Sequence, residues 1–198
     1  MIRIATEKDI PQMLAIYAPY VENTTYSFEY TPPTQEQFTQ RFRKYTAQCP
    51  WLVWEEDGRV LGYAYGSLPF ERAAYAWCAE VSIYLEPAAH GRGIGRALYA
   101  VLEEILWRQG YRIIYSLITS ENKGSLSFHE KVGYRYCTEF TDCGVKFGKS
   151  LGVIWMEKRS ISVEIPSCPP VPWTTIVNND QKLTDVLASL PLSFSQNM

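Results

Sequence analysis

A glycine-rich junction between a strand-like and a helix-like segment constrains this chain most. Residues 80–85 alternate like a strand, and the apolar residues that follow Ile94 recur at helical spacing. Between them lies the stretch 90–96, His-Gly-Arg-Gly-Ile-Gly-Arg. Glycines let a backbone turn its N–H groups toward one point, where the helix dipole adds positive charge, and the two arginines reinforce it. The junction therefore predicts an anion-binding loop at the start of a helix.

Two common phosphate loops do not fit this junction. A dinucleotide loop needs the spacing G-x-G-x-x-G, whose third glycine would fall on Arg96, and no strand at the start of the chain leads into such a loop. A phosphate loop ending in G-K-[ST] is also absent from the stretch. For this hexamer taken alone, an ordinary glycine-rich turn stays open as the alternative.

Two motifs in order resemble the GNAT family of N-acetyltransferases. The hexamer 90–95 is similar to the family's Q/R-x-x-G-x-G/A pyrophosphate loop, with His90 at its first position. Residues 122–134, N-K-G-S-L-S-F-H-E-K-V-G-Y, resemble its N-x-x-A/S-x-x-F/L-Y/H-x-K-x-G-F/Y stretch. The resemblance implies that acetyl-CoA is the co-substrate, and Asn122 would also suit a helix N-cap. The cofactor contacts implied by these motifs are His90, Gly91, Arg92, Gly93, Ile94, Gly95, Arg96, Asn122 and Ser125.

Periodicity along the chain predicts alternating strands and helices. We expect strands at 2–5, 51–56, 60–67, 75–85, 112–119 and near 136–140 and 151–158, and helices after a capping box at 6–9 and at 34–48, 94–108 and 122–132. Asp57-Gly58 is a hairpin turn signal, and Gly110 is the expected C-cap of the third helix. This is the element order of the GNAT fold, an α/β (α+β) arrangement with a mixed central sheet of about seven strands and helices on both faces.

Length and composition favour one catalytic domain with a tail. We expect the domain at 1–159 and a proline-rich tail at 160–198, in which prolines disfavour sheet or helix and only 182–190 could form a short helix. The net charge of −2 and the pI near 5.8 argue against a nucleic-acid surface. Without a long apolar stretch or a signal-peptide core, the expected location is cytoplasmic, with no membrane partner. Five cysteines without a C-x-x-C pair predict reduced thiols and no metal site.

Further stretches resemble the phosphinothricin acetyltransferase branch of GNAT. They are residues 16–29, 50–53, 57–58, 72–84 and 146–148, and the resemblance extends from residue 2 to about residue 158. Enzymes of this branch acetylate the amino group of glutamate-like or methionine-like compounds, such as phosphinothricin and methionine sulfoximine or sulfone. The resemblance also implies a homodimer. One departure is Gly152, which stands where the branch commonly has the aspartate of a W-x-D element.

The chemistry of amide formation suggests the catalytic groups. The attacking amine must be neutral, and a free α-amino group has a pKa of about 7.7–8.0, so a nearby base helps. Glu80 matches the position of the family's general base, and its apolar neighbours predict partial burial that raises its pKa. The resemblance implies a backbone oxyanion donor near Ile83, Tyr84 and Leu85. His129 takes the place of a tyrosine that protonates the leaving thiolate in many GNAT enzymes; it could do so, hydrogen-bond the cofactor or be structural.

A glutamate-like acceptor also needs partners for its acidic groups. Arg72, Tyr75 and Lys146 are candidates, with a surface charge or a core aromatic as the ordinary alternative at each. Phe28 and Glu29 would line the amine side by resemblance. Two rival functions share the cofactor motifs: a protein N-terminal or ribosomal-protein acetyltransferase, and a non-catalytic acyl-CoA-binding module. The first would need an open peptide groove, and the retained Glu80 argues against the second.

Overall fold

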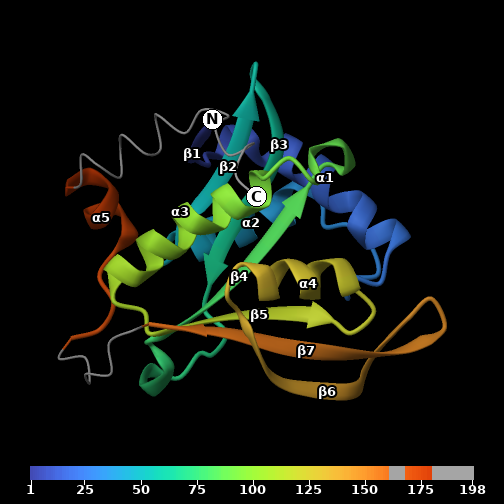
Figure 1. Ribbon diagram of the computed structural model, residues 1–198. Helices are drawn as coiled ribbons and strands as arrows, with labels where there is room; N and C mark the ends of the chain where they lie inside the picture. Colours follow the sequence, from blue (N-terminus) through green and yellow to red (C-terminus); the bar gives the residue numbers. More distant parts are fainter. Residues whose placement is uncertain (161–167, 180–198) are drawn as a thin grey trace.

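The computed structural model describes residues 1–160 and 168–179, which fold around one seven-stranded sheet (Figure 1). The strands are β1 (Ile2–Ile4), β2 (Trp51–Glu56), β3 (Arg59–Ser67), β4 (Cys78–Leu85), β5 (Ile113–Thr119), β6 (Arg135–Lys146) and β7 (Lys149–Arg159). The helices are α1 (Ile10–Asn23), α2 (Gln35–Thr46), α3 (Ile94–Gln109), α4 (Lys123–Lys131) and α5 (Trp173–Asn179), with 3₁₀ turns η1 (Glu7–Asp9), η2 (Ala73–Tyr75) and η3 (Pro87–Ala89). The predicted mixed sheet with helices on both faces is confirmed.

The sheet has the order β1-β2-β3-β4-β5-β7-β6, and only β4 and β5 run parallel. Their pairing is short, because it covers Cys78–Ile113, Ala79–Ile114 and Glu80–Tyr115 and then ends. On its other edge β4 stays paired with β3 as far as Leu85. The two halves of the sheet therefore part between β4 and β5, beyond Glu80.

Two hydrophobic clusters cover the two faces of the sheet. One contains the inward side chains of α3, such as Leu98 and Leu102, and partly buried residues of α4 pack against it. The other joins α1 and α2 to β2 and β3, where Trp51 and Tyr63 stack with ring centroids 5.8 Å apart. Apolar residues at helical spacing explain why each helix faces the sheet.

Local signals set most element ends where the sequence predicts them. The Thr34 hydroxyl accepts from the Gln37 N–H and begins α2, and Gly110 ends α3 at a φ of +102°. Asp57 and Gly58 both have positive φ, as a two-residue hairpin turn requires. Strand β4 begins three residues later than predicted because Ala73–Tyr75 forms a 3₁₀ turn. Strands β6 and β7 are longer than predicted and form one hairpin.

Helix α5 contradicts the expectation that the prolines disfavour helix throughout the tail. It packs on α3, the Trp173 indole N–H donates to the Thr46 carbonyl at 2.8 Å, and the Val171 N–H donates to Gln109. Pro172 precedes α5 and so leaves its hydrogen bonds intact. The predicted helix at 182–190 lies outside the described residues. None of the described helices is long and apolar enough to cross a membrane.

Candidate active site

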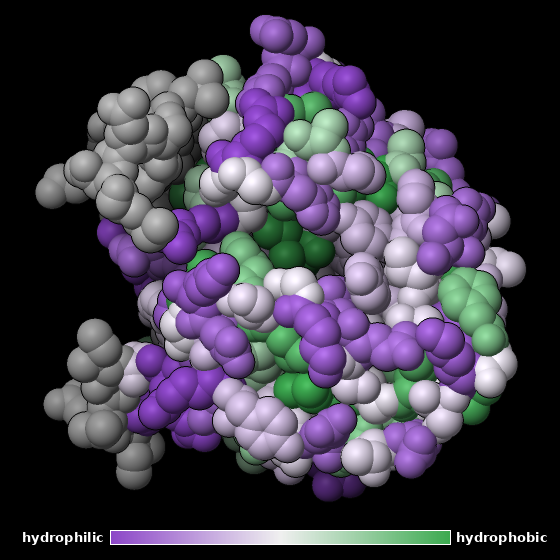
Figure 2. Space-filling view, turned by 45° about the vertical axis from the view of Figure 1, so that its right-hand side comes forward, coloured by the Kyte–Doolittle hydropathy of each residue, from purple (hydrophilic) through white to green (hydrophobic). Residues whose placement is uncertain are grey.

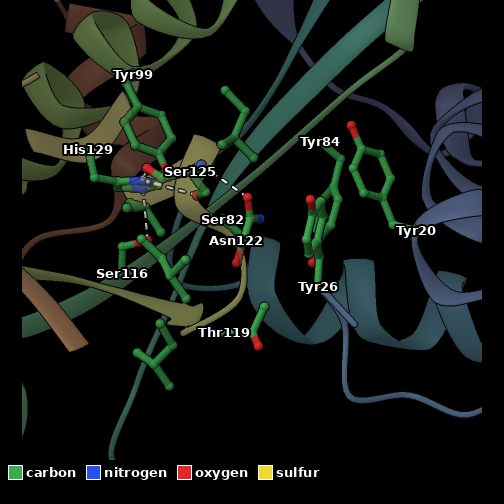
Figure 3. A pocket seen from close by; sticks show the side chains of 14 residues that line it. Tyr20, Tyr26, Ser82, Tyr84, Tyr99, Ser116, Thr119, Asn122, Ser125 and His129 are labelled. Atoms are coloured by element: carbon green, nitrogen blue, oxygen red, sulfur yellow. Dashed lines mark hydrogen bonds between the residues drawn. The ribbon is translucent and has the colours of Figure 1, made fainter. Parts of the chain in front are cut away.

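A cleft that is partly open to solvent lies where β4 and β5 part (Figure 3). Three tyrosines line one end, and a histidine with several hydroxyl and amide side chains lines the other. Its lining residues are Tyr20, Tyr26, Val81, Ser82, Ile83, Tyr84, Tyr99, Ser116, Leu117, Ile118, Thr119, Asn122, Ser125 and His129. Figure 2 shows a hollow in one face of the molecule, with hydrophobic residues at its floor and hydrophilic residues around it.

Two strand edges border the cleft with no neighbouring strand in the described part of the chain. Beyond Glu80, β4 pairs there only with β3, and beyond Tyr115, β5 pairs only with β7. Backbone N–H and C=O groups on these edges are free of the sheet ladder, so an extended chain that carries amide groups can pair with them. Ile83 and Tyr84 line this opening, and Leu85 lies at its outer end. The Thr119 hydroxyl, which also lines the cleft, is buried without a hydrogen-bond partner in the described part of the chain.

The glycine loop follows η3 and begins α3. Gly91 and Gly93 have φ of +74° and +79°, and apart from their own chain neighbours no atom of the described residues lies within 4 Å of the place where a Cβ would stand on either. Among the described residues, no side chain caps the N-terminus of α3, so the first-turn N–H groups are available to an anion. Gly95 differs, because a Cβ there would stand 3.3 Å from Ile83. The loop has the open backbone expected of an anion site.

The charged and polar side chains near the loop differ in whether they already have partners. The Arg92 guanidinium donates to both carboxylate oxygens of Glu56, at 2.8 and 2.9 Å, so an anion would have to share it. Arg96 is exposed, and its guanidinium has no hydrogen bond or ion pair with the residues that the structure describes. The exposed His90 lies with Nε2 3.2 Å from the Tyr20 hydroxyl, which donates to the Leu85 carbonyl at 2.6 Å.

Glu80 stands at the point where the strands part. It is the last β4 residue paired with β5, opposite Tyr115, and Ser67 lies opposite it on β3. It is half-buried, and burial raises the pKa of its carboxyl to about 7. No ion pair to Glu80 occurs within the described ranges, which leaves desolvation as the cause of the shift. A carboxyl of this pKa can exchange a proton near neutral pH.

His129 is held by hydrogen bonds on both ring nitrogens (Figure 3). Its Nδ1 lies 2.8 Å from the Ser125 carbonyl, which only accepts, so Nδ1 carries the proton. Its Nε2 lies 2.8 Å from the Ser116 hydroxyl and 3.0 Å from the Tyr99 hydroxyl. Burial lowers the pKa of the ring to about 4, so the imidazole is neutral at pH 7 and Nε2 is an acceptor. Direct proton donation from Nε2 is not available to this tautomer.

Asn122 and Ser125 join the cleft to the start of α4. The Asn122 side chain accepts from the Ser125 N–H at 3.0 Å, which is the N-cap that the residue type predicts. Both residues also line the cleft, so capping and ligand contact are compatible.

The residues predicted for the amine side lie in two places. Phe28 and Glu29 belong to the loop between α1 and α2, where Glu29 accepts from the Tyr17 hydroxyl at 2.8 Å and pairs with Arg41. The Lys146 side chain is almost fully buried, and its ammonium donates to the carbonyls of Val21 and Ser27, both at 2.7 Å. Direct binding of a substrate by Lys146 would require its ammonium to leave these two acceptors.

Arg72 and Tyr75 lie in the connection between β3 and β4, and both are exposed. The ring centroids of Tyr75 and Phe70 lie 4.7 Å apart, and the Phe70 ring stacks on Trp155 of β7 with centroids 5.8 Å apart. None of the five predicted amine-side residues lines the cleft itself. An aspartate at position 152, as in the W-x-D element, would be crowded, because a Cβ there would stand 3.1 Å from the Phe140 carbonyl and the neighbouring atoms would have to shift slightly.

Six polar residues of the cleft were not predicted as site residues from the sequence, and they are Tyr20, Tyr26, Ser82, Tyr99, Ser116 and Thr119. Ser116 and Thr119 lie within the predicted strand 112–119, which is the β5 side of the opening. Only the register of β5 against β4 shows that their part of the strand is unpaired on that edge.

Comparison with known proteins identifies the domain type. Residues 2–155 match the family described as "Acetyltransferase (GNAT) domain". Phosphinothricin N-acetyltransferase of Alcaligenes faecalis is 36% identical over 162 residues, which cover 79% of this chain and 81% of the relative. An L-methionine sulfoximine/L-methionine sulfone acetyltransferase of Pseudomonas aeruginosa is 34% identical over 163 residues, which cover 79% of this chain and 92% of the relative.

A solved structure has the same fold. It is a GNAT superfamily phosphinothricin acetyltransferase from Sinorhizobium meliloti in complex with AcCoA, with a TM-score of 0.81 and 29% identity. The match covers 87% of this chain and 96% of that chain.

Proposed function

Because the chain belongs to the GNAT acetyltransferase family, we propose that it acetylates the amino group of a small amino-acid-like substrate. The acetyl donor is acetyl-CoA, and the proposed acceptors are of the phosphinothricin, methionine sulfoximine or methionine sulfone type. The observation that carries the proposal is the position of Glu80 on β4: it is the last residue paired with β5, the next residue, Val81, already lines the cleft, and the same strand leads on to the glycine loop. Identities of 34–36% to enzymes named for these acceptors support the substrate class.

The residues around the cleft fit acetyl-CoA. Open backbone at Gly91 and Gly93, the uncapped start of α3 and the exposed Arg96 would hold its phosphates. The free edges of β4 and β5 and the unpartnered Thr119 hydroxyl suit the amide-bearing pantetheine arm. When bound, acetyl-CoA supplies an acetyl group activated as a thioester.

Glu80 would act as the general base. An α-amino group has a pKa of about 7.7–8.0, so a carboxylate with a pKa of about 7 can accept its proton with little thermodynamic penalty. The proton moves from the amine nitrogen to a Glu80 oxygen, directly or through one water. The neutral amine is then the nucleophile.

Backbone N–H groups of Ile83, Tyr84 or Leu85 would stabilise the oxyanion. These residues lie on the part of β4 that has no β5 partner, where an N–H group directed at the opening is not used by the sheet. Fixed backbone donors are effective because they need no reorganisation when charge develops.

The geometry of His129 favours a role through its neighbours. Neutral Nε2 can accept a hydrogen bond from Ser116 or from Tyr99, but its single lone pair cannot take both hydroxyls. The two hydroxyls also hydrogen-bond each other, so the second hydroxyl can donate either to the first or, once acetyl-CoA is bound, to the leaving sulfur atom. We therefore propose that His129 orients these two hydroxyls at the cleft, and that one of them donates to the sulfur.

The acceptor panel tests the substrate class. Thiol release from acetyl-CoA is measured with phosphinothricin, methionine sulfoximine, methionine sulfone, ordinary amino acids and an N-terminal peptide, with Glu80→Gln as the matched control. Turnover of the first three that is lost in the variant supports the proposal. Activity on the peptide alone would indicate protein acetylation, and binding of acetyl-CoA without turnover of any acceptor would indicate a non-catalytic binding module.

Other expectations from the sequence stay predictions. They are a catalytic domain at 1–159 with a tail at 160–198, a homodimer and a cytoplasmic location. Sedimentation analysis of the full chain tests the dimer.

A further inference from the structure

The loop between α1 and α2 lies beside the end of the β6–β7 hairpin (Figure 1). The loop is far from the hairpin in sequence, since Ser27 and Lys146 are 119 residues apart. It also carries Tyr26, which lines the cleft. The position of one cleft wall therefore depends on what fastens this loop.

Lys146 makes the two central hydrogen bonds that hold the loop. Its ammonium donates to the carbonyl of Val21, in the last turn of α1, and to the carbonyl of Ser27 in the loop. The side chain is 2% exposed. A buried ammonium is costly unless it is hydrogen-bonded, so the two carbonyls and Lys146 hold one another in place. The two bonds bracket the segment that contains Tyr26.

Two further contacts fasten the same loop to the same hairpin. The Tyr30 hydroxyl donates to the Val145 carbonyl at 2.8 Å. The Phe28 ring lies against Gly144, where an added Cβ would stand 2.4 Å from a ring carbon. These contacts involve backbone atoms of β6, so they set where the loop lies along the strand.

Tyr26 is the member of the loop that is directed at the cleft. Its side chain is 43% exposed, and it lines the cleft near Tyr20 and Tyr84 (Figure 3). Its neighbours Thr25 and Ser27 are instead tied down, by hydrogen bonds to Glu121 and to the Tyr17 hydroxyl. The loop is thus a fixed support that presents one aromatic side chain.

We propose that Lys146 is a positioning residue that holds the α1–α2 loop, and with it Tyr26, in the place where the amine substrate is received. It acts through the Val21 and Ser27 carbonyls and not through a charge contact with the substrate. The inference rests on the proposed function, because it assigns the loop to the amine side of the same site.

The test compares the steady-state kinetics of Lys146→Met with those of Lys44→Met, a control that removes an exposed charge on α2. We expect Lys146→Met to raise the KM for the amine roughly tenfold and to leave the KM for acetyl-CoA unchanged. Tyr30→Phe removes a surface fastening of the same loop and should shift the amine KM in the same direction by less. It provides a second variant if Lys146→Met does not fold.

Two readouts separate positioning from direct binding and from general stability. Hydrogen exchange of the amides of residues 24–30 should become faster in Lys146→Met, independently of activity. The amine KM should rise by the same factor for an acceptor and for its carboxyl ester, because no charge contact with the substrate is lost.

Several results would overturn the inference. A KM increase confined to acceptors with a free carboxylate would show direct binding by Lys146. Unchanged amine KM in both variants, or an equal rise in the acetyl-CoA KM, would show that the contacts are only structural. If the wild-type chain acetylates none of the amines, the proposed function fails instead, and the exchange measurement still tests whether Lys146 holds the loop.

Discussion

Replacing Glu80 by glutamine removes the proposed base and should change the pH dependence in a defined way. With a pKa of about 7, the ionised fraction of Glu80 rises roughly tenfold between about pH 6 and about pH 8. A carboxyl with its ordinary pKa would be ionised throughout this range. Glu80→Gln should lower turnover by about 10²- to 10⁴-fold, the usual contribution of a general base.

The ratio of wild-type to variant kcat/KM isolates this group. The substrate amine also titrates in the same range, but it does so in both proteins, and its effect cancels in the ratio. We expect the ratio to rise roughly tenfold from about pH 6 to about pH 8. Calorimetric titration with acetyl-CoA serves as the control, and its affinity should be unchanged.

The same shift has a consequence for stability. The folded-state pKa lies above the ordinary value of 4.5, so the native state favours the protonated carboxyl, and stability is lost as the pH rises through about 7. The folded and ordinary pKa values of Glu80 differ by about 2.5, so its carboxyl lowers the free energy of unfolding by about 3 kcal/mol at pH 8 and by less than about 1 kcal/mol at pH 5. Glu80→Gln should therefore be more stable than the wild type in urea at the higher pH. A constant activity ratio together with equal pH dependence of stability would show that Glu80 does not titrate near neutral pH and is not the base.

Three other changes test separate parts of the site and core. Gly93→Ala places a Cβ on backbone with a φ of +79°, which costs about 1 kcal/mol of conformational strain without a steric clash. The KM for acetyl-CoA should therefore rise about fivefold while the KM for the amine stays constant. An unchanged KM for acetyl-CoA would contradict the role of the loop. His129→Gln should lower kcat by roughly tenfold without moving the midpoint of the pH–kcat profile, because the pKa of the ring, about 4, lies below the assayed pH range. If the variant instead loses a pH-dependent step of that profile near neutral pH, the histidine itself titrates there. Lys158→Met leaves the buried Glu103 carboxylate without its partner at 2.6 Å and should cost about 3 kcal/mol in urea unfolding, most of which Glu103→Gln in the same chain should restore.

Local patterns in the sequence were sufficient for most of the fold. Strand β2 has the predicted bounds, and α3 begins at Ile94 as predicted and ends one residue later. These elements carry strong periodicity and clear stop signals, such as Gly110 with its positive φ. The element order followed from this periodicity, and the family resemblance then supplied the fold to which that order belongs and the cofactor.

Side-chain partners could not be predicted in the same way, because they come from distant parts of the chain. Arg92 is a plausible anion ligand by position, yet it shares its charge with Glu56, 36 residues away. Lys146 resembles a surface charge in the sequence, yet its ammonium is buried against two backbone carbonyls. The tautomer of His129 depends on the Ser125 carbonyl one helical turn earlier and on Ser116 of β5. Composition and spacing do not record such contacts.

The early end of the β4–β5 pairing links the glycine loop to Glu80 through a length requirement. Parallel neighbours direct the same ends to one edge of the sheet, so the loop after β4 and the start of α4 after β5 flank one opening. From Glu80 to Leu85, five residues of strand span about 16 Å at about 3.3 Å per residue. A compact anion held by the loop would not reach the carboxylate, whereas an extended chain with an anionic head would. Donor and base can therefore meet only if the ligand is linear and lies along the unpaired edges, which is why truncating the donor should abolish turnover even when its anionic part still binds.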